Sequence, residues 1–65
     1  MLQYTTIIRR LARMKAASEL SGSFGNISAE VQMAAMIYGK KPETIRRAVS
    51  TIYPQVFKTM ARGGY

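Results

Sequence analysis

Two glycine-containing breaks divide this chain into three segments, and each segment has the spacing of apolar residues that is typical of an amphipathic helix. The first break, Ser21–Asn26, holds two glycines, two serines and an asparagine, residue types that favour turns over helix. The second break is Gly39, where a helix can end because glycine adopts the left-handed conformation without steric cost. The pattern predicts an all-α fold of short packed helices.

The first segment, from Tyr4 to about Ala17, places arginines and apolar residues on opposite sides of a helix. The apolar arc comprises Tyr4, Ile7, Ile8, Leu11 and Met14, and the arginines are Arg9, Arg10 and Arg13. Lys15 falls near the apolar edge, where its aliphatic stem can cover apolar surface while its amine stays in water. We expect the apolar arc to face the core, together with Phe24 and the five methionines of the chain.

The second and third segments carry start signals of helices. A helix is expected from about Ala29 to Tyr38, with the Ser28 hydroxyl as its N-cap. Pro42 begins the next helix, because the missing N–H of proline costs nothing in a first turn. Its apolar stripe is Ile45, Ala48, Val49 and Ile52.

The last part of the chain contains a second proline. Pro54 disfavours helix at Tyr53, so a break or kink is expected there. A short last helix from Gln55 to about Arg62 then follows. The fold expected for the whole chain is therefore a domain of three to four helices.

The chain has 65 residues, which allows a single domain, 1–65. Cysteine and histidine are absent, which removes disulfides, zinc fingers, thiol nucleophiles and the commonest general base. Glu19, Glu30 and Glu43 are too far apart in sequence to suggest a metal site or an acid/base pair. We therefore expect no enzyme activity and no cofactor. A core of this size contributes roughly 3–5 kcal/mol, so we expect a homodimer.

Ten lysines and arginines oppose three carboxylates and give a net charge of +7. This charge favours a polyanionic partner, with nucleic acid first and an anionic membrane second. No apolar run is long enough to span a bilayer, and the N-terminal order of apolar and basic residues is not that of a signal peptide. These features predict a cytoplasmic protein without a membrane partner.

A helix, a glycine turn and a second helix with basic residues at its start form the local pattern of a helix-turn-helix. Val31–Ser50 resembles the helix-turn-helix family of small phage, plasmid and bacterial transcriptional regulators over the twenty-residue motif. The residues that carry the resemblance are Ala35, Gly39, Ile45 and Ala48. One departure is Lys40, where the family usually has a buried apolar residue. Either its stem lies over the core with the amine exposed, or the turn is one residue longer.

The resemblance implies sequence-specific binding of double-stranded DNA, with transcriptional regulation, by a repressor for example, as the role. The residues implied to face DNA are Gln32, Lys40, Lys41, Glu43, Thr44, Arg46, Arg47 and Ser50, with Pro42 among them on the same face. Arg46 and Arg47 are the candidates for reading bases, because a guanidinium can grip guanine with two hydrogen bonds. Arg9, Arg10 and Arg13 form a secondary basic patch, which either touches phosphates or only keeps the protein in solution.

Two other classes of function fit the same size and charge. A small basic adaptor or inhibitor could bind an acidic surface of a host factor, and the direction of the arginines distinguishes it from a DNA-binding protein. A membrane-active cationic peptide is disfavoured by the clear turn and cap signals and by the lack of tryptophan. Within the leading class, a winged helix needs a β-hairpin after the recognition helix, which Gln55–Tyr65 does not supply.

Overall fold

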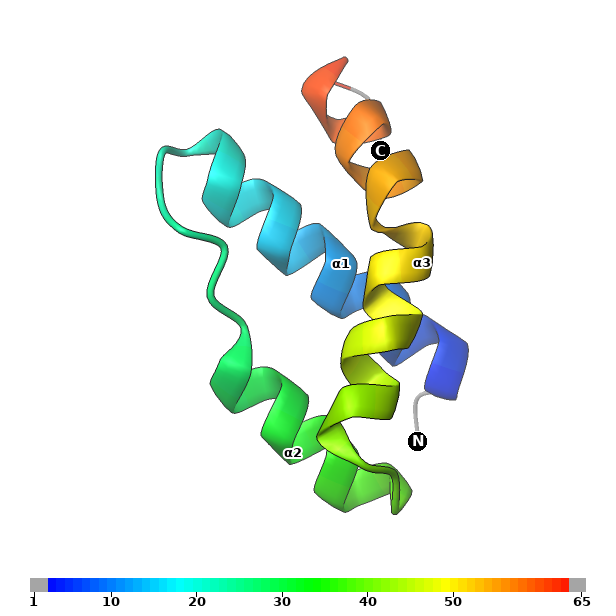
Figure 1. Cartoon of the computed structure of the whole chain (residues 1–65). Coiled ribbons are helices and arrows are strands. Elements are labelled where there is room, and N and C mark those ends of the chain that lie inside the picture. Colours follow the sequence, from blue (N-terminus) through cyan, green and yellow to red (C-terminus); the bar gives the residue numbers. More distant parts are fainter. Residues whose placement is uncertain (1–2, 64–65) are drawn as a thin grey trace.

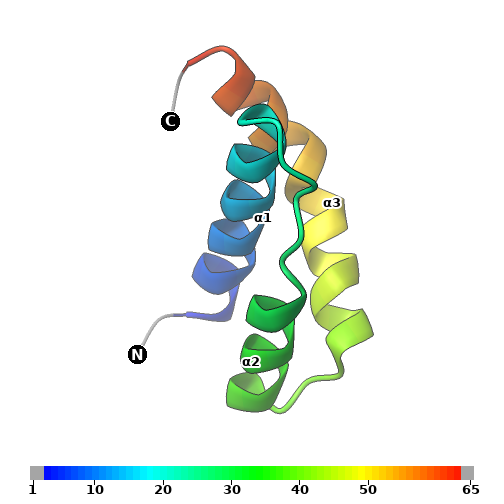
Figure 2. The same ribbon diagram turned by 90° about the vertical axis from the view of Figure 1, so that its left-hand side faces the viewer.

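The computed structural model describes residues 3–63, and this part of the chain is all-helical, as predicted. Its helices are α1 (Tyr4–Leu20), α2 (Ser28–Tyr38) and α3 (Pro42–Ala61). α1 and α3 pack against each other and both rise from the bottom of the view to the top, while α2 runs in the opposite sense (Figure 1). Seen from the side, α2 lies below α1 at the lower end of the molecule, and α3 runs alongside both (Figure 2).

The core lies where the three helices meet. Its buried residues are Ile8, Leu11, Ala12, Ile27, Val31, Ala34, Ala35, Ile45 and Val49. Val31 and Ile45 are the largest side chains that are fully buried. The apolar stripe predicted for α3 is confirmed, because Ala48 and Ile52 pack against the same cluster. Four of the ten buried apolar residues in the described part are alanines, so the core holds little side-chain volume.

α1 faces the core with most of its predicted apolar arc, because Tyr4, Ile7, Ile8 and Leu11 lie in or against the core. The helix is rotated, however, so that Ala12 and Ala16 are buried as well. Ala12 and Ala16 are fully buried, whereas Met14 is 39% exposed, so the predicted arc is wrong at Met14. Ile8 and Leu11 are buried as expected. The rotation follows from the packing on α3, because small side chains let two helix backbones approach closely.

The loop between α1 and α2 points Phe24 into solvent. Phe24 is 98% exposed, so the expectation that it anchors the loop to the core is wrong. The backbone on both sides of it is tied to Ser18. The Ser23 N–H donates to the Ser18 carbonyl at 2.9 Å, and the Gly25 N–H donates to Ser18 Oγ at 3.2 Å. These bonds place the loop without any contribution from the aromatic ring.

α2 begins one residue earlier than expected and uses a different cap. Ile27 occupies the N-cap position, and Ser28 is the first helical residue and gives no side-chain cap. Instead Asn26 Oδ1 accepts a hydrogen bond from the Ser28 N–H at 3.0 Å, as in an Asx turn. The Ser28 hydroxyl accepts from Arg46 Nη2 at 3.3 Å. The predicted role of Ser28 as N-cap is therefore wrong. Its N–H bonds to Asn26 and its hydroxyl accepts from Arg46 instead of from a backbone N–H of the first turn.

α3 continues through Pro54, so the predicted break at Tyr53 and the separate last helix are wrong. A proline inside a helix removes one backbone hydrogen bond and crowds the carbonyl four residues earlier. Contacts on both sides of Pro54 oppose this cost. Tyr53 and Phe57 pack ring against ring with centroids 5.7 Å apart, Val56 packs on the core, and Lys15 Nζ lies 4.4 Å from the Tyr53 ring centroid.

The methionines do not fill the core as expected. Met33 and Met36 are 64% and 83% exposed, and only Met60 is half-buried. Met1 lies outside the described residues. Large apolar side chains therefore remain on the surface of α2, although four of the ten buried apolar residues in the described part are alanines.

Candidate nucleic-acid interface

A short turn joins α2 to α3 and positions the residues that the sequence assigned to DNA. Gly39 has φ 62° and ψ 34°, the left-handed conformation predicted for it. The Lys40 N–H donates to the Ala35 carbonyl at 2.9 Å, a bond typical of helices that end at a left-handed glycine. Lys41 is the N-cap of α3, and Pro42 is its first residue. Backbone hydrogen bonds thus fix the path of the chain into α3.

The Lys40 side chain is exposed and its amine lies near an aromatic ring at the edge of the core. Its Nζ lies 5.6 Å from the ring centroid of Tyr4, a distance at which the amine is attracted to the ring face. Tyr4 in turn packs edge-on against Tyr38, with centroids 5.5 Å apart. The departure from the family pattern at Lys40 is therefore compatible with a closed turn.

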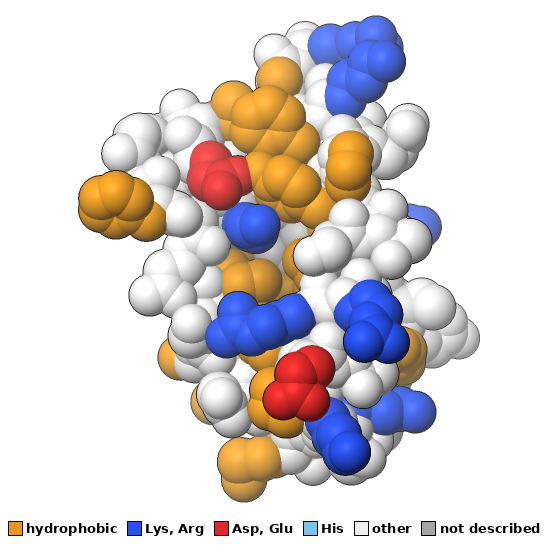
Figure 3. Space-filling view, in the orientation of Figure 1, with side chains coloured by type: hydrophobic (Ala, Val, Ile, Leu, Met, Phe, Trp, Pro, Cys, Tyr) orange, Lys and Arg blue, Asp and Glu red, His pale blue; other side chains and the backbone are white. Residues whose placement is uncertain are grey.

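All the residues predicted to contact DNA through α2, the turn and α3 are exposed except Pro42, which is half-buried. The exposed ones are Gln32, Lys40, Lys41, Glu43, Thr44, Arg46, Arg47 and Ser50. Figure 3 shows lysine and arginine side chains spread over the face formed by the turn and α3. We call Lys40, Lys41, Arg46 and Arg47 the basic face.

Arg46 and Arg47 differ in their surroundings, although the sequence predicted both to project away from the core. Arg47 falls opposite the buried pair Ile45 and Val49 on α3, as expected. Arg46 is also exposed, and its Nη2 donates to Ser28 Oγ of α2 at 3.3 Å. Among the described residues Arg47 has no side-chain hydrogen bond, whereas Arg46 is oriented by Ser28.

A hollow of about 200 Å³ beside Arg46 brings Lys15 of α1 to the basic face. Asn26 and Ser50 also line this hollow. Lys15 is half-buried, and its amine lies over the Tyr53 ring, which confirms that its stem covers apolar surface. The sequence did not assign Lys15 to the site. Its position at the apolar edge of α1 was the available signal, because that edge packs on α3.

The secondary basic patch of α1 divides between two sides of the helix. Arg9 and Arg13 line a shallow hollow with Gln55 and Thr59 of α3, whereas Arg10 lines a groove on the side of α2. All three arginines are exposed, as expected. A single partner surface on α1 would therefore engage Arg9 and Arg13 together, but not Arg10.

Comparisons with known protein families, with curated proteins and with solved structures find no match to this chain. Within residues 3–63, no helix is long and apolar enough to cross a membrane. The same residues contain no group of three side chains of metal-ligating type.

Proposed function

We propose that the chain binds double-stranded DNA through the turn after α2 and the first half of α3, as a helix-turn-helix transcriptional regulator of the cytoplasm. The observation that supports this proposal best is the position of Arg47, which is exposed and opposite the buried side of α3. The net charge of +7 supplies attraction to any duplex. The resemblance of Val31–Ser50 to the helix-turn-helix family agrees with both.

In this proposal the basic residues have different roles. Arg47 reads a base edge in the major groove, because its guanidinium projects from α3 and has no hydrogen-bond partner among the described residues. Arg46 contacts a phosphate at the border of α2, where Ser28 already orients it. Lys40 and Lys41 contact phosphates on the other side of the turn. Glu43 serves the positive end of the α3 dipole.

The experiment is a selection of preferred duplexes from a random pool, followed by fluorescence anisotropy on the selected and a scrambled duplex. Arg47→Ala is expected to weaken binding to the selected duplex by about 1–3 kcal/mol and to the scrambled duplex much less. Lys58→Ala is the matched control, because Lys58 is exposed on the same side of α3. It lies eleven residues further along, roughly 16 Å away. The control is expected to keep the preference between the two duplexes.

Arg46→Ala tests the division of roles. It is expected to weaken both duplexes alike and to flatten the dependence of the affinity on salt, as loss of a phosphate contact does. Equal losses on both duplexes for Arg47→Ala would show that Arg47 only contacts the backbone. An absence of binding even at low salt would refute the proposal, and a basic adaptor for an acidic protein would then be the leading function.

A further inference from the structure

The apolar surface of α2 is larger than its packing in the monomer requires. Val31, Ala34 and Ala35 face the core, while Met33, Met36 and Ile37 on the other side are 64%, 83% and 61% exposed. A helix that is apolar on all sides is normally buried on all sides. Three large apolar side chains of α2 are therefore left uncovered.

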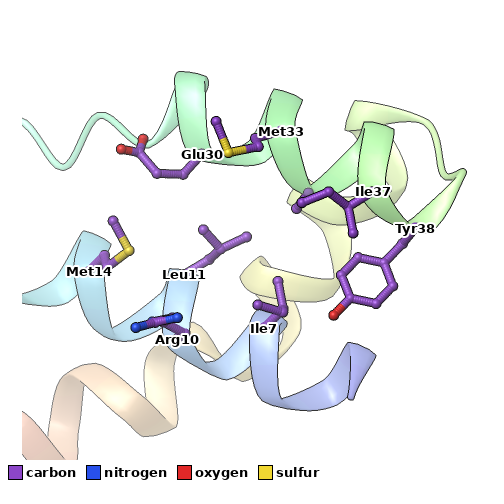
Figure 4. Close-up of a pocket in the computed structure, with 9 residues that line it drawn as sticks. Ile7, Arg10, Leu11, Met14, Glu30, Met33, Ile37 and Tyr38 are labelled. Atoms are coloured by element: carbon purple, nitrogen blue, oxygen red, sulfur yellow. The ribbon is translucent and has the colours of Figure 1, made fainter. Parts of the chain in front are cut away.

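The exposed side of α2 continues into a groove against α1. The groove has a volume of about 330 Å³, with Ile7 and Met14 contributed by α1 and Met33 and Ile37 by α2. Figure 4 shows the lining residues on the facing parts of the two helices, with Ile7 and Leu11 directed from α1 toward α2. We call this groove, together with Met36, the α2 apolar face. Contiguous apolar surface of this kind marks sites of protein association, and methionine adapts its shape to a partner.

The charge distribution favours a second copy of the chain as the partner. The net charge is +7, yet Ser28–Tyr38 contains no lysine or arginine and one acid, Glu30. Two copies therefore repel each other least when they meet through α2. Polyanions have the opposite preference and are attracted to the basic face.

The rims of the groove carry complementary charges. Arg10 lines it on the α1 side and Glu30 on the α2 side (Figure 4). In a two-fold symmetric dimer the same surface is used by both copies, so a contact between residues i and j occurs twice. Arg10 of each copy can thus pair with Glu30 of the other.

We propose that the protein forms a symmetric homodimer through the α2 apolar face, with reciprocal Arg10–Glu30 pairs at its rim. A specific interface buries about 800 Å² per partner, about a sixth of the surface of 4767 Å² of the chain. The small core supplies the reason for the association, because short domains without disulfides commonly gain stability by oligomerisation. The proposal does not depend on DNA binding, since the groove is lined by residues of α1 and α2, whereas Arg46 and Arg47 lie on α3.

The first experiment measures molecular mass by light scattering and sedimentation over a micromolar to millimolar range, at moderate salt. We expect the wild-type chain to dimerise. Met33→Glu and Ile37→Glu are expected to raise the dimer dissociation constant at least about tenfold, because each carboxylate would be buried at an apolar contact. Phe24→Glu is the matched control, since Phe24 is 98% exposed outside the groove, and it is expected to dimerise as the wild type does.

Circular dichroism verifies that each variant is folded. We expect both variants to fold, because Met33 and Ile37 are exposed and their replacement leaves the core unchanged. A wild-type chain that is monomeric throughout the range would overturn the proposal. Loss of the dimer in Phe24→Glu as well would show non-specific association and would also overturn it. A dimer that survives in Arg47→Ala while DNA recognition is lost would separate this proposal from the proposed function.

The second experiment tests the reciprocal pairs by charge reversal. In a homodimer of Arg10→Glu, two carboxylates face each other at each of the two Arg10–Glu30 contacts. In a homodimer of Glu30→Arg, two guanidinium groups face each other there. Each variant alone is therefore expected to dimerise more weakly than the wild type. A mixture of the two variants restores an opposite-charge pair at both positions, so heterodimers are expected to predominate in native mass spectrometry. A statistical mixture of species, or no heterodimer, would refute the Arg10–Glu30 pairing.

Discussion

Gly39→Ala isolates the conformational cost of the turn between α2 and α3. The backbone at Gly39 is left-handed, with φ 62°, and apart from its neighbours in the chain a Cβ there would have no heavy atom within 4 Å. The substitution thus adds backbone strain without a clash. This strain is about 1–2 kcal/mol for an L-residue, and it is larger for Gly39→Val because of the β-branch. The loss is a large share of the roughly 3–5 kcal/mol expected for a domain of this size.

Gly25→Ala provides the comparison in which strain and crowding act together. Gly25 also has a positive φ, 70°, but a Cβ there would lie 2.7 Å from Cγ of Glu19. We expect Gly25→Ala to destabilise the protein more than Gly39→Ala. In a Glu19→Ala background the crowding is absent, so the cost of Gly25→Ala is expected to fall to that of Gly39→Ala.

Thermal and urea unfolding followed by circular dichroism measure these differences. A loss of 1–2 kcal/mol corresponds to a decrease in Tm of roughly 4–16 °C for a domain of this length. Gly39→Asn is expected to lose less than Gly39→Ala, because asparagine tolerates the left-handed region better than other side chains. An unchanged Tm in Gly39→Ala would show that the turn does not need a left-handed residue, and the account of the turn would then be wrong.

Two further substitutions test the core and the long helix. Ile45→Ala is expected to cost about 2–5 kcal/mol and Ile45→Val about 0.5–1.5 kcal/mol, because Ile45 is fully buried; equal urea midpoints for the two variants would contradict the packing described. Pro54→Ala is expected to raise Tm by restoring a backbone hydrogen bond of α3, with a gain of up to about 3 kcal/mol, and a decrease in Tm would mean that the helix depends on the proline.

The sequence predicted which residues of the candidate site are exposed better than it predicted how they are arranged. The exposed cations of the turn and of α3 follow from helical periodicity, because residues between the apolar positions of a helix must face water. Arg46 and Lys15 could not be placed in this way. Arg46 bonds to Ser28, eighteen residues away in sequence, and Lys15 reaches Tyr53 of another helix, and no local pattern encodes such pairings.

The sequence by itself determined three helical segments that begin close to Tyr4, Ser28 and Pro42, the left-handed turn at Gly39 and the strong positive charge. Each of these depends on local sterics or on simple counting. Only the tertiary structure decided that α3 continues through Pro54, that Ala12 and Ala16 displace Met14 from the core, and that Phe24 faces solvent. The physical reason is that the distance between two packed helix backbones limits the size of the side chains that fit between them. The pattern of apolar residues along the chain does not contain this distance.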